Sequence, residues 1–574
     1  MVSLQSRWAR FRHAFSSFHA FHEAIKLENG SSLSNEDLWP SPPERRTWRA
    51  FDFFAYWWSE SWAVATWSVG SSMITLGATV RDAILIVLFA NLVSAVVIVL
   101  NGRAAACYHI GYPVLSRTSF GINGTYFVVI LRALLGIIWG GVQLYFEGQF
   151  IAVCLRCIFS GWDRIPNTIP EDQYITVQSF IGFVIAAVTA IPFMCVHTTK
   201  IRHFFNVKSI VIPLACMAVV IWATVANGGV SADKLVDESA RTSTSVFAWG
   251  LIAQFNAVMG ANCALLVTVP DLARYSKTHR SQVYGQALGL PLAQTVCASF
   301  GVITTAALKN MYGQAYWNPY DLLNGILDNE NYSSGARAGV FFLALSWAFS
   351  ALGTSLATNV APFAADVTCL APRYVNIIRG QFIWLIIAFA IVPWRIVATA
   401  NGFLQFLNGY AIFQGSVVGI MLVDYFYVRR GNIHLPDLFT TSSLGRYYYT
   451  KGFNIRAFVS FVAGFLLPFP GFIASFGHSM AEAATQMFHL GWVLSLLVGS
   501  TAYFLGCLIC KVPGDDRSFT FEEKVAAADE MILAGNLADF VPSSGASDKS
   551  EKENPTVAEA EDARQDRSVD GGIV

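Results

Sequence analysis

A series of long apolar segments constrains this chain more than any other feature of its sequence. Of the 574 residues, 54% are hydrophobic and 13% are charged, whereas a soluble domain carries about 25% charged residues. About twelve segments are long enough to cross a bilayer, which takes roughly 20 apolar residues. Because a helix satisfies its own backbone hydrogen bonds in lipid, and because barrel strands run to only about ten residues, we expect an all-α polytopic membrane protein.

The expected transmembrane helices are 53–77, 82–101, 123–155, 175–196, 207–227, 246–269, 284–308, 338–361, 379–397, 401–427, 455–477 and 487–510. They divide the chain into a polar N-terminal segment (1–50), a transmembrane domain (51–510) and a polar tail (511–574). The tail is expected to be disordered, because it contains too little apolar surface to fold alone. The formal net charge is zero, so nothing indicates nucleic acid as a partner.

Neither a leader nor a metal site is expected. No apolar segment follows the first arginines within about thirty residues, unlike a signal peptide. The ten cysteines are scattered, and the pairs 154/157 and 507/510 lack a second pair or a histidine cluster. We therefore expect no metal, no disulfide framework and no cofactor.

The loop charges predict the orientation. With the N-terminus inside, the inside loops contain fifteen lysines and arginines and the outside loops eight, so the positive-inside rule places both termini in the cytosol. Asn331 begins a glycosylation sequon in an outside loop. We favour the plasma membrane. In the tail, Lys524, Lys549 and Lys552 could be substrates of ubiquitin-dependent trafficking machinery, and a merely solvated tail is the alternative.

Two small-residue stretches predict interrupted helices. Residues 68–73, which include Ser71, and residues 260–263, which include Asn262, lie within apolar runs. They belong to the first helices of two five-helix sets, about 53–227 and 246–427, followed by extra helices at about 455–510. Transporters with inverted repeats often bind substrate at such interruptions. The alternative is ordinary packing of small residues between membrane helices.

The third expected helix has polar side chains at membrane depth. Trp139, Gln143 and Glu147 lie at i, i+4 and i+8, and therefore share one helix face. An indole can stack on a flat ring, and an amide can read the N–H and C=O groups at its edge. The alternative is that these side chains pack between helices.

Other polar residues lie in the first and eighth helices. Asn359 could complete the ligand contacts, and Thr354 is a candidate cation ligand. Glu60 and Glu147 are candidate proton carriers, because charged groups at membrane depth usually have a function. The alternatives are a structural acid held in a salt bridge, or a Glu60 close enough to the interface to remain hydrated. Asp366 lies near the inner end of the eighth helix and is expected to make an end-of-helix contact.

Several motifs in matching order resemble the nucleobase–cation symporter family 1, and within it the fungal uracil/allantoin permease (Fur-like) branch. The resemblance extends over about 35–510 and rests on 35–40 with 46–48, 117–121, 139–143, 270–275, 352–354, 359, 366, 372, 379–382, 424–425 and 429–431. It implies a LeuT-type fold of five plus five helices with two additional ones. It also implies proton-coupled import of a nucleobase or related small heterocycle, with sodium coupling not favoured.

The resemblance also assigns roles to individual residues. Trp139 would stack on the ring, Gln143 and Asn359 would bond it, and Glu60 would couple the proton. Thr354 corresponds to a position near the sodium site of bacterial relatives. The expected gating residues are Asp37, Lys277, Asp366 and Leu407.

One position departs from the family pattern. Many relatives have an aromatic at the interruption of the sixth helix, where this chain has Asn262. The alternatives are therefore a larger ligand, such as a nucleoside, thiamine or nicotinamide riboside, or a transport-deficient receptor. No nucleophile elbow or cofactor loop is present in the sequence, so we do not expect an enzyme.

Overall fold

The computed structural model describes residues 26–27, 33, 35, 37–196, 202–229, 244–513, 521 and 523. In this part of the chain, nine helices are long and apolar enough to cross a membrane. The other three expected spans are a first helix divided in two and the shorter apolar helices Ile377–Ala390 and Ile455–Leu466. The described residues contain isolated β-bridges but no strand. The prediction of an all-α polytopic protein is confirmed.

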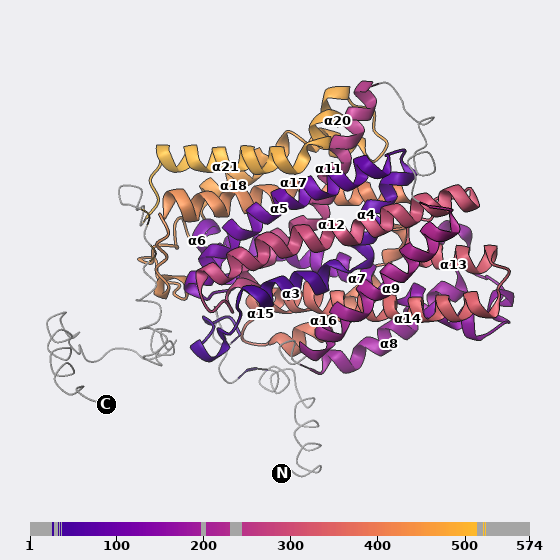
Figure 1. Cartoon of the computed structure of the whole chain (residues 1–574). Helices are drawn as coiled ribbons and strands as arrows, with labels where there is room; N and C mark the ends of the chain where they lie inside the picture. The colour runs from indigo at the N-terminus through magenta and orange to yellow at the C-terminus, as the bar shows by residue number, and fades with distance from the viewer. Residues whose placement is uncertain are drawn as a thin grey trace, which may run out of the picture.

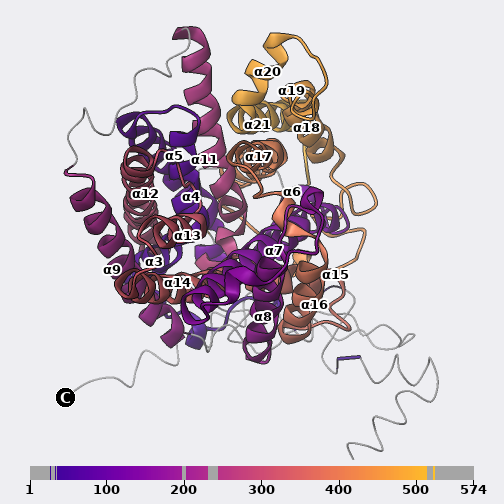
Figure 2. The same cartoon turned by 90° about the vertical axis from the view of Figure 1, so that its right-hand side faces the viewer.

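One group of helices, here called the core bundle, packs around the second and seventh expected spans. Its members are α3 (Ala50–Ser61), α4 (Val64–Thr75), α5 (Val80–Tyr108), α11 (Thr244–Ala273) and α12 (His279–Tyr312). Figure 2, which looks along most of the helices, shows them on one side of the molecule. A Cβ on Gly301 of α12 would lie 2.7 Å from the carbonyl oxygen of Trp67. Glycine therefore permits the close approach of α12 to α4.

A second group, here called the scaffold, packs around α7 (Figure 2). Its members are α7 (Thr125–Ile158), α8 (Val177–Met194), α14 (Ser334–Thr354), η6 (Ser355–Val360), α15 (Ala361–Leu370) and α16 (Ile377–Ala390). Helix α9 (Arg202–Ala226) packs against α3 and α12 of the core bundle and α14 of the scaffold. It therefore links the two groups.

The remaining helices lie beside these groups or at their ends. A third group, in which α17 also packs on α11, consists of α17 (Ala400–Val423), η8 (Asp424–Val428), α18 (Ile455–Leu466), α19 (Phe469–Ala474), α20 (Glu482–His489) and α21 (Gly491–Ile509). Figure 1 shows α6 (Tyr112–Phe120) and α13 (Pro319–Asn329) at opposite ends of the molecule. Short 3-10 turns occupy Pro43–Arg45, Trp162–Arg164, Glu171–Gln173, Pro393–Arg395 and Pro436–Leu438.

The first helix is interrupted, but not where the small residues predict. The chain leaves the helix at Trp62 and Ala63, and the Trp62 carbonyl accepts a 2.6 Å hydrogen bond from Ser350 on α14. This bond satisfies a backbone group that the break exposes. Residues 68–73 remain helical within α4, and the Ser71 and Ser72 hydroxyls donate to carbonyls of their own helix. The prediction of a break at 68–73 is wrong.

The predicted interruption of the sixth helix is also wrong. Helix α11 continues through residues 260–263. A Cβ on Gly260 would lie 2.8 Å from the Leu407 carbonyl carbon, so this glycine allows α17 to pack closely on α11. The alternative reading, small residues packing between helices, describes both stretches correctly.

The eighth expected span contains a π-helical turn that the sequence did not indicate. Helix α14 passes into η6 and then α15, so the six residues of η6 widen the helix in the middle of the membrane span. Such turns are rare and occur frequently at functional sites. Asn359 lies in this turn.

Residues before α3 lie across one end of the helices, here called the N-terminal face. Asn35 donates to the Pro372 and Val375 carbonyls, and Arg274 binds Ser41. The segment therefore joins the end of α11 to the loop between α15 and α16. Of the predicted disordered tail, the structure describes 511–513, 521 and 523. Glu523 is ion-paired with Arg103 at 2.7 Å, and the tail lysines lie outside the described residues.

Candidate functional site

A cavity lies between the core bundle and the scaffold, next to the break in the first helix. It comprises about 770 Å³ of space between atoms, part of which is open to solvent. Side chains from α3, α4, α5, α11 and α12 line it on one side, and side chains from α7, α14 and η6 line it on the other. Ligand sites of small molecules are usually apolar cavities with a few placed polar groups. This cavity has that composition.

Trp139 is held in a defined orientation on the cavity wall. Its indole N–H donates a 2.9 Å hydrogen bond to the Tyr410 hydroxyl, which in turn donates at 2.6 Å to the Gly260 carbonyl. The rings of Phe403 and Tyr410 stand nearly perpendicular to the indole, at 84° and 90°. An aromatic plate fixed in this way can stack on a flat ligand.

Gln143 and Asn359 line the same cavity as Trp139. Gln143 is 3% exposed, Asn359 is 6% exposed and Trp139 is 7% exposed. The Gln143 Oε1 atom is buried and accepts no hydrogen bond within the described part of the chain. A buried acceptor without a partner costs free energy, so this amide is available to a ligand's donor. The structure therefore brings together the three residues that the sequence singled out.

A buried ion pair lies beside the cavity. Glu60 lines the cavity at the end of α3, and its Oε1 atom lies 3.4 Å from Lys208 Nζ on α9. Lys208 Nζ also donates a 2.6 Å hydrogen bond to the Thr354 hydroxyl. Glu60 Oε2 has no hydrogen-bond partner among the described residues. A lysine ammonium thus occupies the position between the predicted proton carrier and the predicted cation ligand.

Lys208, the partner of Glu60 beside the cavity, is one residue that sequence reasoning missed. The positive-inside count treats it as one of the fifteen basic residues of the inside loops, but it is completely buried within α9. The signal was present in the sequence, because the expected span 207–227 already contained this lysine. A cation inside a membrane span needs a partner, and Glu60 is that partner.

Two predicted site residues are not placed at the cavity. The Ser71 hydroxyl donates to the Trp317 carbonyl at 2.6 Å and to its own helix, and Ser71 does not line the cavity. Glu147 accepts a 2.9 Å hydrogen bond from Thr189 on α8 and also lies outside the lining. A helix turns about 100° per residue, so eight residues bring Glu147 roughly 80° away from the direction of Trp139.

Asn262 lines the cavity, but its amide is committed elsewhere. Its Nδ2 group donates to Asn91 at 2.8 Å and to Ser94 at 3.0 Å, both on α5. The side chain therefore joins two helices of the core bundle. Trp57 and Trp139 are the aromatic residues in the lining.

The four predicted gating residues lie in four different settings. Asp37 accepts a 3.3 Å hydrogen bond from the Ile377 amide at the start of α16. Lys277 is exposed, and it contacts the N-terminal segment through a 2.8 Å main-chain bond to Trp48. Arg274 makes the side-chain contacts to that segment, including a bond to the Asp37 carbonyl at 3.2 Å. Leu407 is buried against Gly260.

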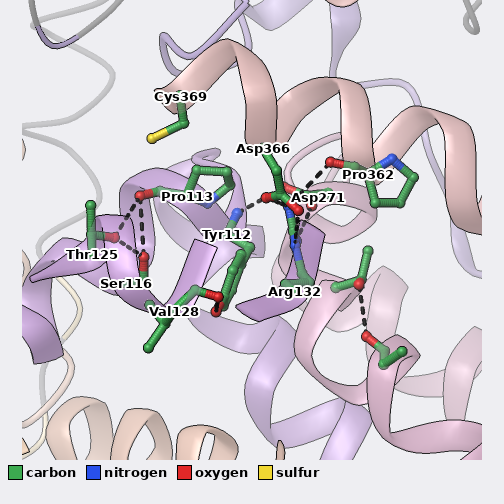
Figure 3. Close-up of polar contacts among 12 residues, drawn as sticks. Tyr112, Pro113, Ser116, Thr125, Val128, Arg132, Asp271, Pro362, Asp366 and Cys369 are labelled. Atoms are coloured by element: carbon green, nitrogen blue, oxygen red, sulfur yellow. Dashed lines mark hydrogen bonds and ion pairs between the residues drawn. The ribbon is translucent and has the colours of Figure 1, made fainter. Parts of the chain in front are cut away.

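Asp366 is part of a buried ionic cluster at the N-terminal face. Its carboxylate binds the guanidinium of Arg132, which also binds Asp271 (Figure 3). Sequence reasoning missed Arg132, although it lies inside the expected span 123–155.

A helical membrane bundle with a small mixed cavity beside a broken helix defines a membrane transporter. The fold is similar to that of Mhp1, described as a nucleobase-cation-symport-1 family transporter. The inward-facing Mhp1 structure aligns with a TM-score of 0.67 at 20% identity, covering 88% of this chain and 99% of Mhp1. A closed form with bromovinylhydantoin bound aligns with a TM-score of 0.64 at 20% identity, covering 87% of this chain and 100% of Mhp1. These similarities confirm the expected LeuT-type fold, whereas the bounds assigned to the two repeats stay a prediction.

The chain belongs to the family of permeases for cytosine/purines, uracil, thiamine and allantoin, whose sequence profile matches residues 40–495. It is 33% identical to an allantoin permease of Saccharomyces cerevisiae over 502 residues, covering 86% of this chain and 78% of the relative. Similarity to a uridine permease of the same yeast is 32% over 495 residues (84% and 76%), and to its uracil permease 30% over 492 residues (84% and 77%). The predicted family resemblance is confirmed, and the protein is a transporter rather than an enzyme.

Proposed function

We propose that this protein is a proton-coupled symporter that imports a small planar heterocycle, a nucleobase or a related ring such as uracil or allantoin. The observation that carries the proposal is the convergence of Trp139, Gln143 and Asn359 on one cavity. The indole stacks on the ring face, and the two amides bond its edge. Permeases for allantoin and uracil among the relatives support this class of substrate.

The proposed coupling ion is the proton. The Lys208 ammonium lies 2.6 Å from the Thr354 hydroxyl, so it provides a fixed positive charge where a sodium ion would otherwise be bound. Glu60 lines the cavity and has one carboxylate oxygen without a partner among the described residues. Protonation of Glu60 removes the charge that holds Lys208 to α3. The proton therefore acts on the ion pair that joins α3, which ends at the helix break, to α9, which packs between the two helix groups.

The proposed orientation places the N-terminal face in the cytosol and the protein in the plasma membrane. The excess of lysine and arginine in the loops on this face supports the orientation. Substrate and proton then enter from outside and leave through the N-terminal face. Transport requires that the two facing states bind substrate differently.

A ribosylated base is the second candidate substrate. The uridine permease is almost as similar to this chain as the allantoin permease, at 32% against 33% identity. The cavity lining also contains further polar groups, among them Gln294 and Thr66, which could bind sugar hydroxyls.

Uptake assays in cells that lack their own nucleobase carriers test the proposal. Radiolabelled uracil, allantoin, other bases and uridine are offered with and without a proton gradient. Uptake of at least one free base is expected, and Trp139→Ala is expected to abolish it. Trp394→Ala is the matched control, because this tryptophan lies outside the cavity lining. Equal losses in both variants, per copy at the cell surface, would show that Trp139 has no specific role.

A further inference from the structure

A buried guanidinium lies between two carboxylates close to the N-terminal face. Arg132 on α7 has a side chain that is 3% exposed. Its Nε atom donates at 2.8 Å to Asp366 Oδ2, its Nη2 atom binds Asp366 Oδ1, and its Nη1 atom donates at 2.6 Å to Asp271 Oδ2. Figure 3 shows both carboxylates next to the guanidinium. Neither Arg132 nor Asp271 belongs to the substrate site described above.

The two carboxylates belong to different helix groups. Asp366 lies on α15, which packs on α7 within the scaffold, so the Arg132–Asp366 pair is internal to the scaffold. Asp271 lies on α11 of the core bundle. The Arg132–Asp271 pair therefore crosses the boundary between the two groups, and the cavity lies along the same boundary.

The cluster lies between the cavity and the N-terminal face. Arg132 precedes Trp139 by seven residues on α7, and Asp366 follows Asn359 by seven on the antiparallel span. Seven helical residues rise roughly 10 Å, so both partners lie about two turns from the cavity, towards the same face. Two contacts of Tyr112 reinforce the pairing of Arg132 with Asp271. The Tyr112 ring lies 4.1 Å from the guanidinium carbon, and the Tyr112 amide donates at 2.8 Å to Asp271 Oδ1.

The two carboxylates differ in burial, so the Arg132–Asp271 pair can separate more easily than the Arg132–Asp366 pair. The Asp271 side chain is 15% exposed, whereas that of Asp366 is 1% exposed. If α11 moves away, Asp271 can gain water, and Arg132 keeps its two hydrogen bonds to Asp366. An arginine without that second partner would be left as an unpaired buried charge, which is strongly unfavourable.

We propose that the Arg132–Asp271 pair is a lock that holds the core bundle against the scaffold on the cytosolic side. Asp366 acts as a positioning residue that keeps Arg132 paired while the lock is open. The inference rests on the alternating exposure of the cavity that the proposed function includes. It is independent of which ring is carried and of the coupling ion.

The test measures access to the cavity from the cytosolic side. Ala65 lines the cavity, and Ala65→Cys provides a reporter in a background where the exposed Cys195 and Cys510 are serine. Inside-out membrane vesicles are treated with a membrane-impermeant maleimide, and the labelling rate is measured for Asp271→Asn and for Asp366→Asn. Both substitutions keep the side-chain size and remove one charge of the same cluster.

The lock predicts opposite effects from the two variants. Asp271→Asn should increase the labelling rate about 5-fold or more, a shift typical of coupled states, because Arg132 stays paired when the groups separate. Asp366→Asn should decrease it, because Arg132 can no longer leave Asp271. Equal effects in the same direction, or an unchanged rate in Asp271→Asn, would overturn the proposal. Should Asp366→Asn not reach the membrane, Asp271→Asn alone decides. Labelling needs no transported substrate, so a lack of base uptake would refute the proposed function without touching this result.

Discussion

Neutralising Glu60 alone is expected to destabilise the protein more than neutralising Glu60 and Lys208 together. Lys208 is completely buried, and its ammonium lies 3.4 Å from the Glu60 carboxylate and 2.6 Å from the Thr354 hydroxyl. Glu60→Gln leaves this ammonium with neutral partners only. Removing one member of a buried ion pair costs about 3–5 kcal/mol.

The reverse substitution is expected to be milder. Lys208→Met leaves a carboxylate that lines the cavity, where it can take up a proton from water and become neutral. The double variant Glu60→Gln with Lys208→Met contains no unpaired charge at all. The two substitutions should therefore be non-additive by about 2 kcal/mol, within the range of direct contacts.

Thermal unfolding in detergent compares the unsubstituted protein, the two single variants and the double variant, and it measures the effect on stability. The pH dependence of uptake by the same proteins measures the coupling of transport to protons. The double variant should unfold at a higher temperature than Glu60→Gln but remain unable to couple transport to protons. Asp424→Asn is a matched control, because Asp424 forms another buried ion pair, with Arg429 at 3.5 Å, outside the cavity lining. It should lower stability while the pH dependence of the remaining uptake stays unchanged.

Two results would refute this reasoning. Additive losses of stability in the double variant would mean that Glu60 and Lys208 do not interact energetically. An unaltered pH dependence of uptake in Glu60→Gln would mean that the proton binds elsewhere.

Three further substitutions test the description of the cavity. Tyr410→Phe removes the acceptor that orients the Trp139 indole, so KM should rise several-fold with little change in surface abundance; an unchanged KM would mean that this bond does not orient the ring. Gln143→Ala should raise KM about 5- to 30-fold, since a lost ligand hydrogen bond costs about 1–2 kcal/mol. Gln149→Ala on the same helix, whose side chain bonds Ser179, should leave KM unchanged, and similar KM values in both glutamine variants would contradict the assignment. Glu147→Gln should leave the pH dependence of uptake unchanged, because Glu147 bonds Thr189 away from the cavity, and a flattened pH profile would restore it as a proton carrier.

The membrane spans and part of the cavity could be predicted from the sequence because their signals are local. Apolar length determines which segments cross a bilayer, and each of the expected spans contains a helix or a pair of helices. Trp139 and Gln143 are one turn apart on α7, so helical periodicity alone places them on one face.

Sequence reasoning failed where a residue's role depends on a distant partner. The glycine and serine content of 68–73 is equally suited to a break and to close packing. The break lies instead at Trp62, where Ser350 on a different helix satisfies the exposed carbonyl. Asn262 lies at the cavity as expected, but only the structure shows that its Nδ2 group bonds Asn91 and Ser94 on α5.

The sequence by itself determined the class of fold, the twelve approximate spans and the shared face of Trp139 and Gln143, because apolar length and helical spacing are properties of consecutive residues. Only the tertiary structure decided which charges are paired. Lys208 pairs with Glu60, and Arg132 pairs with Asp271 and Asp366, and the partners lie 139 to 234 positions apart in the sequence, on different helices. A charge in a membrane is tolerable only with a counter-charge, and which one it meets depends on how the helices pack.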